Sequence, residues 1–306
     1  MGRRRKCCRA TPAKIAHQLS RLGIQVSATT VAHLLKDLMD FRLRVNHKKV
    51  ESGVRNPPDP KRRDQQFHYI EDRFVDFAAR GLPIISIDTK KKELIGNFKN
   101  NGRTWREEAI PVNDHDYPSD AECRMVPFGI YDPLADDGFV CVSTSGDTPA
   151  MAVDAIQRWW RQVGSVRYPE ATDLLLLADC GGANSPRSHV WLHQLQRQLC
   201  DPYGLTVSVC HYPPGASKWN LIEHRLFAEI STNWAGEPLD SVDKAMAFIR
   251  GTETESGLSV RACRIRKNYP LGQKIPRTDF ESLVLCRHET LPAWNYTIYP
   301  WPLAEL

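Results

Sequence analysis

The sequence predicts an α/β fold in which helices flank a mixed β-sheet, preceded by a small basic helical segment. Apolar runs of strand length come first, and later runs alternate with segments of helical periodicity. Two of the runs end directly in an aspartate, as expected where strands deliver side chains to a site at the edge of an open sheet. The 306 residues are enough to bury one large core and a smaller additional domain.

The first expected element is a basic segment over residues 1–50. Residues 1–65 contain 16 Lys or Arg and 5 Asp or Glu, a net charge of +11, whereas the rest of the chain carries −6. A basic arm attached to an acidic body favours a polyanionic partner, and double-stranded DNA is the first candidate. The alternative is a basic tail that is simply solvated.

Two short helices are expected within this segment. Thr11 can cap the first, with Pro12 at its first position, and Gly23 ends it. Ser27 can cap the second. The apolar side chains of the second helix are expected to face inward: Val31, Leu34, Leu35 and Leu38.

Together the two helices look like a helix-turn-helix, with an ordinary helical hairpin as the alternative. The side chains expected to face outward become candidates for contacts with base edges in the major groove of DNA: Thr29, Thr30, His33 and Lys36. Such a motif usually packs on a third helix, and nothing upstream of Arg3 can supply one. We therefore expect this DNA-binding segment to be shortened at its start.

The larger domain is expected over residues 64–306, after a polar, proline-rich linker over 51–63. An amphipathic helix over 64–80 opens it, and Gly81 ends that helix. Strands are expected over residues 82–88, 94–98, 125–131, 139–143, 174–178 and 205–210. Helices are expected from Pro149 with Asp147 as the cap, over 188–199, over 217–231, and once more after Ser241, where the remaining structure is mixed.

Three acidic residues have surroundings that are unusual for a solvated carboxylate. Asp88 and Asp179 each follow an apolar run, and the apolar neighbours of Glu223 at helical spacing place it on an inward face. A charge near a core requires a partner, and few Lys or Arg lie nearby in the sequence. Mg²⁺ prefers oxygen ligands, and two such ions about 4 Å apart can serve a phosphoryl displacement. Each acid taken singly could be an ordinary strand-end or helix residue, but the joint pattern favours a metal site.

Longer motifs surround these acids, which are spaced by 91 and 44 residues. The motifs read ISIDTKKKELIGNFK over 85–99, DCGGANS over 179–185, PPGASKWNLIEHRLF over 213–227 and WNYTI over 294–298. With them, nearly the whole chain resembles the DDE transposases of ISAzo-type insertion sequences, whose catalytic core is ribonuclease-H-like. Cys180 stands where a glycine is expected, and members of the family look longer at the N-terminus.

The resemblance implies a role for each matching residue. Asp88, Asp179 and Glu223 would be the catalytic metal ligands for Mg²⁺ or Mn²⁺, with two ions expected. Neighbouring side chains would hold phosphates or orient these ligands: Lys90, Asn184, Lys218, His224 and Arg225. The implied reaction is phosphodiester cleavage at the element ends, followed by transfer of the freed 3′-hydroxyl into target DNA. Pairing of two ends implies a homo-oligomer on double-stranded DNA.

Two other functions stay open at this point. One is a catalytically silent, transposase-derived DNA-binding regulator, and the other is a structure-selective nuclease that cuts without joining. No run approaches 18 apolar residues, so no membrane association is expected. The nine cysteines show no CxxC spacing and no signal peptide precedes them, which predicts reduced thiols in a cytoplasmic protein.

Overall fold

The computed structural model describes residues 10–42, 59–216 and 219–301. The chain divides into two compact units, Met1–Gly53 and Val54–Leu306, and each is described by itself. Among the described residues, no helix is both long and apolar enough to cross a membrane.

Over residues 10–42, the described part of the smaller unit, the helical elements are α1 (Pro12–Arg21), α2 (Ala28–His33) and η1 (Leu34–Leu38). The predicted caps are confirmed, since Thr11 Oγ1 and Ser27 Oγ accept backbone N–H groups at 3.3 and 3.0 Å. Val31 is buried as predicted, but Leu34 and Leu38 are 41% and 79% exposed, so their predicted inward orientation is wrong. Two short helices do not present enough facing surface to enclose a whole apolar stripe.

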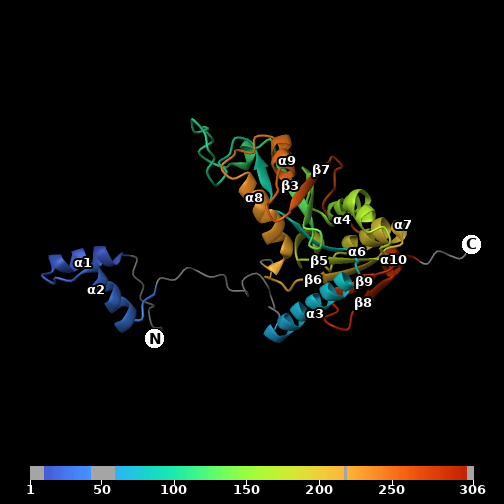
Figure 1. Cartoon of the computed structure of the whole chain (residues 1–306), viewed down its shortest axis with the longest axis horizontal. Helices are drawn as coiled ribbons and strands as arrows, with labels where there is room; N and C mark the ends of the chain where they lie inside the picture. The colour runs from blue at the N-terminus through green and yellow to red at the C-terminus, as the bar shows by residue number, and fades with distance from the viewer. Residues whose placement is uncertain (1–9, 43–58, 217–218, 302–306) are drawn as a thin grey trace, which may run out of the picture. The chain divides into compact units, whose positions relative to one another are not determined.

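The larger unit is built on one mixed sheet, most of whose strands are labelled in Figure 1. Its strands are β1 (Ile84–Thr89), β2 (Glu93–Ile95), β3 (Cys123–Asp132), β4 (Asp137–Ser143), β5 (Asp173–Ala178), β6 (Thr206–His211), β7 (Ser259–Ile265), β8 (Leu285–Arg287) and β9 (Asn295–Ile298). The order across the sheet is β7-β4-β3-β1-β5-β6-β9-β8, with β2 paired to β3. Strands β1, β5 and β6 are parallel, and β3 is antiparallel to both of its neighbours β1 and β4. The predicted mixed α/β sheet is confirmed.

Helices cover both faces of this sheet. They are α3 (Pro60–Ala79), α4 (Pro149–Trp159), α5 (Ser165–Arg167), α6 (His189–Leu195), α7 (Asp201–Tyr203), α8 (Ala228–Asn233), α9 (Val242–Arg250) and α10 (Arg277–Glu281), with the π-helical segments η3 (Trp160–Gly164), η5 (Gln196–Cys200) and η7 (Glu223–Phe227). Ile85 and Ile87 pack with α4 and α6, whereas Ile84 packs with α3. Because side chains alternate along a strand, Ser86 and Asp88 share the face of Ile84.

Two helix starts and one helix cap differ from the sequence prediction. Helix α3 begins at Pro60, capped by Asp59, so residues 60–63 are helical rather than part of a linker. Thr148 caps α4 through its hydroxyl, and Asp147, predicted as the cap, makes other contacts. The helix predicted from residue 217 begins after Asn220. The mixed C-terminal part supplies β7 at one edge of the sheet and β8 with β9 at the other.

Candidate active site

Adjacent parallel strands bring the first two acids together. In the register of β1 and β5, Ile87 lies opposite Ala178, so Asp88 is beside Asp179 at the carboxyl ends of both strands. Neighbouring strands in a sheet are about 4.8 Å apart, and paired residues point to the same face. The sheet register therefore accounts for the meeting of two carboxylates that are far apart in the sequence.

Asn220 connects this edge to the helix that carries Glu223. Its Oδ1 accepts a hydrogen bond from Ser86 Oγ at 2.5 Å, and its Nδ2 donates to Asp88 Oδ2 at 3.4 Å. The backbone N–H of Ile222 in turn donates to Ser86 Oγ at 3.3 Å. Asn220 and Ser86 are fully buried, so this small network fixes the start of the Glu223 helix against β1.

A glycine makes the close approach of this helix possible. Gly129 of β3 is paired with Asp88 of β1, and a Cβ placed on it would lie 2.4 Å from the ring of Phe227 and 2.9 Å from Ile222. No side chain larger than hydrogen fits at that separation, so Gly129 allows the segment 222–227 to pack directly on the sheet beside Asp88.

Burial and neighbouring carboxylates raise the pKa of two acids at this site, Asp88 and Asp179. Burial is the largest cause at Asp88, followed by the charge of Asp179, and together with Glu223 they raise the pKa of Asp88 to about 8. The backbone N–H of Thr89, 2.7 Å from Asp88 Oδ1, and the Asn220 amide oppose that shift. The pKa of Asp179 is also raised, mainly by burial and by the charge of Glu223. The three carboxylates are therefore close enough to interact electrostatically.

Asp88 and Asp179 open onto a cavity of about 400 Å³. Its lining comes from the end of β1, the loops after β1 and β5, and the loop before α4: Asp88, Thr89, Lys90, Lys91, Lys92, Asp147, Asp179, Gly181, Gly182, Ala183 and Asn184. Glu223 does not line this cavity. Asp147 adds a fourth carboxylate, which accepts a hydrogen bond from Thr89 Oγ1 at 3.0 Å and pairs with Lys92 Nζ at 3.2 Å.

The donor set of this site fits a hard divalent cation. Among the described residues, no Lys, Arg or His forms an ion pair with Asp88, Asp179 or Glu223, and Asp179 Oδ1 is buried without a hydrogen-bond partner. Uncompensated carboxylates of this kind require a cation, and oxygen-only ligands suit Mg²⁺ or Mn²⁺. No group of three or more His, Cys, Asp or Glu in the described part of the chain forms a ready-made metal site. The side chains would therefore have to draw closer around a bound ion.

A chain of buried hydrogen bonds fixes the backbone carbonyl group of Asp179. His211, at the end of β6, donates from Nδ1 to the carbonyl oxygen of Asp179 at 2.7 Å. Its Nε2 then accepts from Tyr296 Oη at 3.0 Å, and Tyr296 accepts from Trp191 Nε1 at 2.7 Å. Burial lowers the pKa of His211 to about 4, so the ring is neutral and the direction of each hydrogen bond is fixed.

The residues predicted to assist the acids occupy different positions. Lys90 is buried, with Nζ 3.1 Å from Glu93 Oε1 and 4.6 Å from the ring centre of Trp234, so a phosphate contact would have to break that ion pair. Asn184 is buried next to Asp179 and lowers its pKa through a hydrogen bond. The two remaining described residues, His224 and Arg225, lie exposed beside Glu223. Lys218 lies outside the described residues.

The candidates in the smaller unit are all at the surface. Thr29, Thr30, His33 and Lys36 are exposed on α2 and η1. Thr30 Oγ1 shares a hydrogen bond with Ser27 Oγ at 2.8 Å, and His33 pairs with Asp37. Thr29 and Lys36 are the side chains in this set with no recorded hydrogen bond or ion pair among the described residues.

Sequence reasoning missed three residues that organise the site. Asn220 lies inside a motif quoted above, but its contact with β1 depends on the packing of the helix. Asp147 was assigned to a helix cap because it precedes Pro149. His211 ends an apolar run, as Asp88 and Asp179 do, and that position was the available signal.

The chain is similar to known proteins over most of its length. A family model described as the Rhodopirellula transposase DDE domain matches residues 3–300. No curated protein matches the chain. Solved structures similar to it include the Mos1 transposase paired-end complex with left transposon end, at 15% identity and a TM-score of 0.45, covering 78% of this chain and 65% of that one. The Mos1 strand transfer complex is 13% identical with a TM-score of 0.46, covering 78% of this chain and 64% of that one. This chain thus spans less than two thirds of the length of these solved relatives.

Proposed function

The chain belongs to the family of Rhodopirellula transposase DDE domains, and we propose that it is a DNA transposase that cleaves phosphodiesters at element ends and joins the freed 3′-hydroxyl to target DNA. The observation that carries this proposal is the meeting of Asp88 with Asp179 at adjacent strand ends, within electrostatic range of Glu223. The regulator and nuclease alternatives have no comparable support.

In the proposed mechanism, Asp88, Asp179 and Glu223 would hold two divalent cations, Mg²⁺ or Mn²⁺. When bound, such ions would supply activation of the attacking oxygen and charge stabilisation of the leaving oxygen for an in-line displacement at phosphorus. The chain's contribution is to position the ligands. Asn220 orients the Asp88 carboxylate, and His211 fixes the backbone of Asp179. We expect the smaller unit to bind double-stranded DNA, and the protein to work in the cytoplasm as a homo-oligomer that pairs two ends.

The decisive experiment compares Glu223→Gln with Glu229→Gln in a strand-transfer assay with and without Mg²⁺, using the DNA of the element end as donor. Both variants remove one negative charge from the same helical segment, and both side chains are half-buried. We expect the first to lose nicking and joining and the second to keep both. A Glu223→Gln protein that nicks DNA at the parental rate would falsify the assignment. Metal-independent DNA binding without any cleavage by the parent would favour the regulator, and cutting without joining would favour the nuclease.

A further inference from the structure

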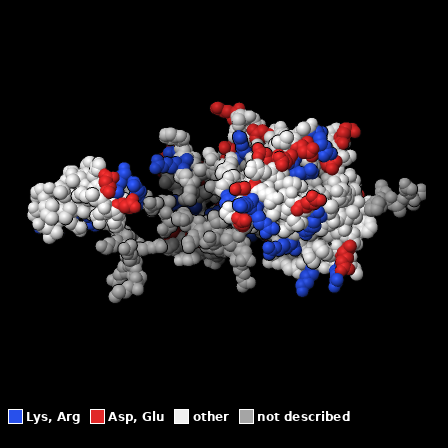
Figure 2. Space-filling model, turned by 90° about the horizontal axis from the view of Figure 1, so that it is seen from below, with Lys and Arg blue, Asp and Glu red and all other residues white. Residues whose placement is uncertain are grey.

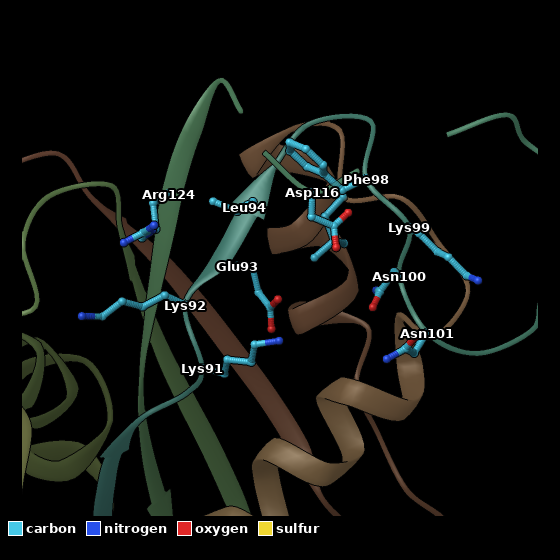
Figure 3. A pocket seen from close by; sticks show the side chains of 11 residues that line it. Lys91, Lys92, Glu93, Leu94, Phe98, Lys99, Asn100, Asn101, Asp116 and Arg124 are labelled. Atoms are coloured by element: carbon cyan, nitrogen blue, oxygen red, sulfur yellow. The ribbon is translucent and has the colours of Figure 1, made fainter. Parts of the chain in front are cut away.

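A second cavity adjoins the acidic one and has the opposite charge. It has a volume of about 460 Å³ and shares Lys91 and Lys92 with the acidic cavity. Four of its lining residues are cationic and two are acidic: Lys91, Lys92, Lys99 and Arg124 against Glu93 and Asp116. Figure 3 shows these side chains around the cavity, with Glu93 between Lys91 and Lys92 on one side and Lys99 on the other. We call this cavity the basic groove.

The cations of the basic groove differ in their availability. Lys92 is paired with Asp147, whereas Lys91, Lys99 and Arg124 are exposed and form no ion pair within the described residues. The nearby acid Glu93 is neutralised from the other side by the buried Lys90 at 3.1 Å. The basic groove therefore presents a net positive charge to solvent.

The surrounding surface makes this local charge significant. Residues 66–306 carry a net charge of −6, and on the face shown in Figure 2 blue and red side chains are interspersed over the larger unit. A unit with this balance can hold a polyanion only where cations are concentrated. The scaffold of the basic groove is also well anchored, since Leu94 of β2 pairs with Arg124 of β3, and Phe98 is buried just before Lys99.

We propose that Lys91, Lys99 and Arg124 bind backbone phosphates of the DNA segment that adjoins the reacting phosphodiester. The inference rests on the proposed function, because the basic groove leads away from the acidic cavity at Lys91 and Lys92. Lysine and arginine supply sequence-independent phosphate contacts, which position a strand rather than read its bases. The basic groove thus holds the strand in register while the acids act on one phosphodiester.

The test uses the full chain and a matched control. One variant combines Lys91→Gln, Lys99→Gln and Arg124→Gln. The control combines Arg161→Gln, Arg266→Gln and Lys274→Gln, which remove the same charge from exposed residues that line neither cavity. Fluorescence anisotropy measures affinity for labelled element-end duplex against salt, with Ca²⁺ in place of Mg²⁺. The smaller unit is identical in the parent, the groove variant and the control variant, so its contribution to DNA affinity cancels in the comparison.

Each lost phosphate contact should make the slope of log K against log salt less negative by about one. For the groove variant, we expect the slope of log K against log salt to be less negative by about two to three, and the affinity to be at least about tenfold weaker. The control should have a slope and an affinity close to those of the parent. Equal slopes in the two variants would overturn the groove assignment. Binding is measured without catalysis, so the two proposals can fail separately. If the parent is inactive in strand transfer but the groove variant still shows the less negative salt slope, the transposase proposal fails and the groove assignment stands.

Discussion

Replacing Asp88 by Asn tests the electrostatics of the acidic site without requiring catalysis. Burial and the neighbouring carboxylates raise the pKa of Asp88 from 3.8 to about 8, so at pH 7 the ionised form is disfavoured in the folded chain and favoured in the unfolded one. One pKa unit is about 1.4 kcal/mol, and about three units separate pH 7 from the ordinary value of 3.8, which gives a cost of about 4 kcal/mol to folding.

Asparagine removes that cost but disturbs one hydrogen bond. Its amide nitrogen would face Asn220 Nδ2, which now donates to Asp88 Oδ2 at 3.4 Å. If the lost bond costs about 1–2 kcal/mol, the net gain in the free energy of unfolding is about 2 kcal/mol. For a unit of this size we expect Tm to rise by roughly 4–8 °C.

The assay is thermal unfolding at pH 7 in EDTA and then in Mg²⁺. Because the folded pKa of Asp88 lies above the unfolded one, its contribution to stability is present below pH 3.8 and is lost progressively as pH rises to about 8. The advantage of Asp88→Asn should therefore grow between pH 5 and pH 8. Mg²⁺ should raise the Tm of the parent more than that of the variant, since a ligand stabilises the state that binds it.

Asp243→Asn serves as the control, because the Asp243 side chain is 88% exposed and the same substitution there should change stability by less than about 0.5 kcal/mol. The reasoning is refuted if Asp88→Asn melts below the parent in EDTA and Mg²⁺ raises both melting temperatures equally.

Three further predictions concern other parts of the chain. Asn220→Ala strands the hydroxyl of Ser86 and should lower the free energy of unfolding by about 2 kcal/mol in urea titrations, and an unchanged midpoint would contradict the network described here. The folded pKa of His211, about 4, lies below its ordinary value of 6.5, so stability falls as pH drops through 6.5. Between pH 7.5 and pH 5 that loss is about 2 kcal/mol, and His211→Asn should lack it; an identical pH profile in the variant would argue against a buried neutral ring. Lys36→Gln should reduce the salt slope of DNA binding by about one with no preference among sequences, and an unaltered slope would remove Lys36 from the interface.

Local patterns in the sequence were sufficient to predict most of the elements. Strand β1, the α1 cap at Thr11 and the α2 cap at Ser27 follow from short-range rules on apolar periodicity and hydrogen bonding. The two aspartates were also singled out correctly as strand-end residues, since a run of buried residues followed by an acid is visible without tertiary information. Their meeting depends on parallel pairing of β1 with β5, which the sequence order allows but does not state.

What the sequence could not predict depends on contacts between distant segments. Asn220 reaches Ser86 across 134 residues, and Tyr296 reaches His211 across 85. The buried state of Lys90 also depends on Trp234, which a local reading of three consecutive lysines cannot include. In the smaller unit the helical period predicts which face is apolar, but the exposure of Leu38 shows that periodicity does not guarantee a covering partner.

The position of β9 has a consequence for how the protein matures during synthesis. Asp88 and Asp179 are synthesised before β9, but the hydrogen-bond chain that supports Asp179 includes Tyr296, which lies on β9. Domains emerging from a ribosome fold as units once their sequence is available, and non-local strand pairing comes late. A nascent chain that has not yet released β9 would thus expose an incompletely supported acidic site. The DNA-cutting activity proposed here would be withheld until β9 has been synthesised and has joined the sheet.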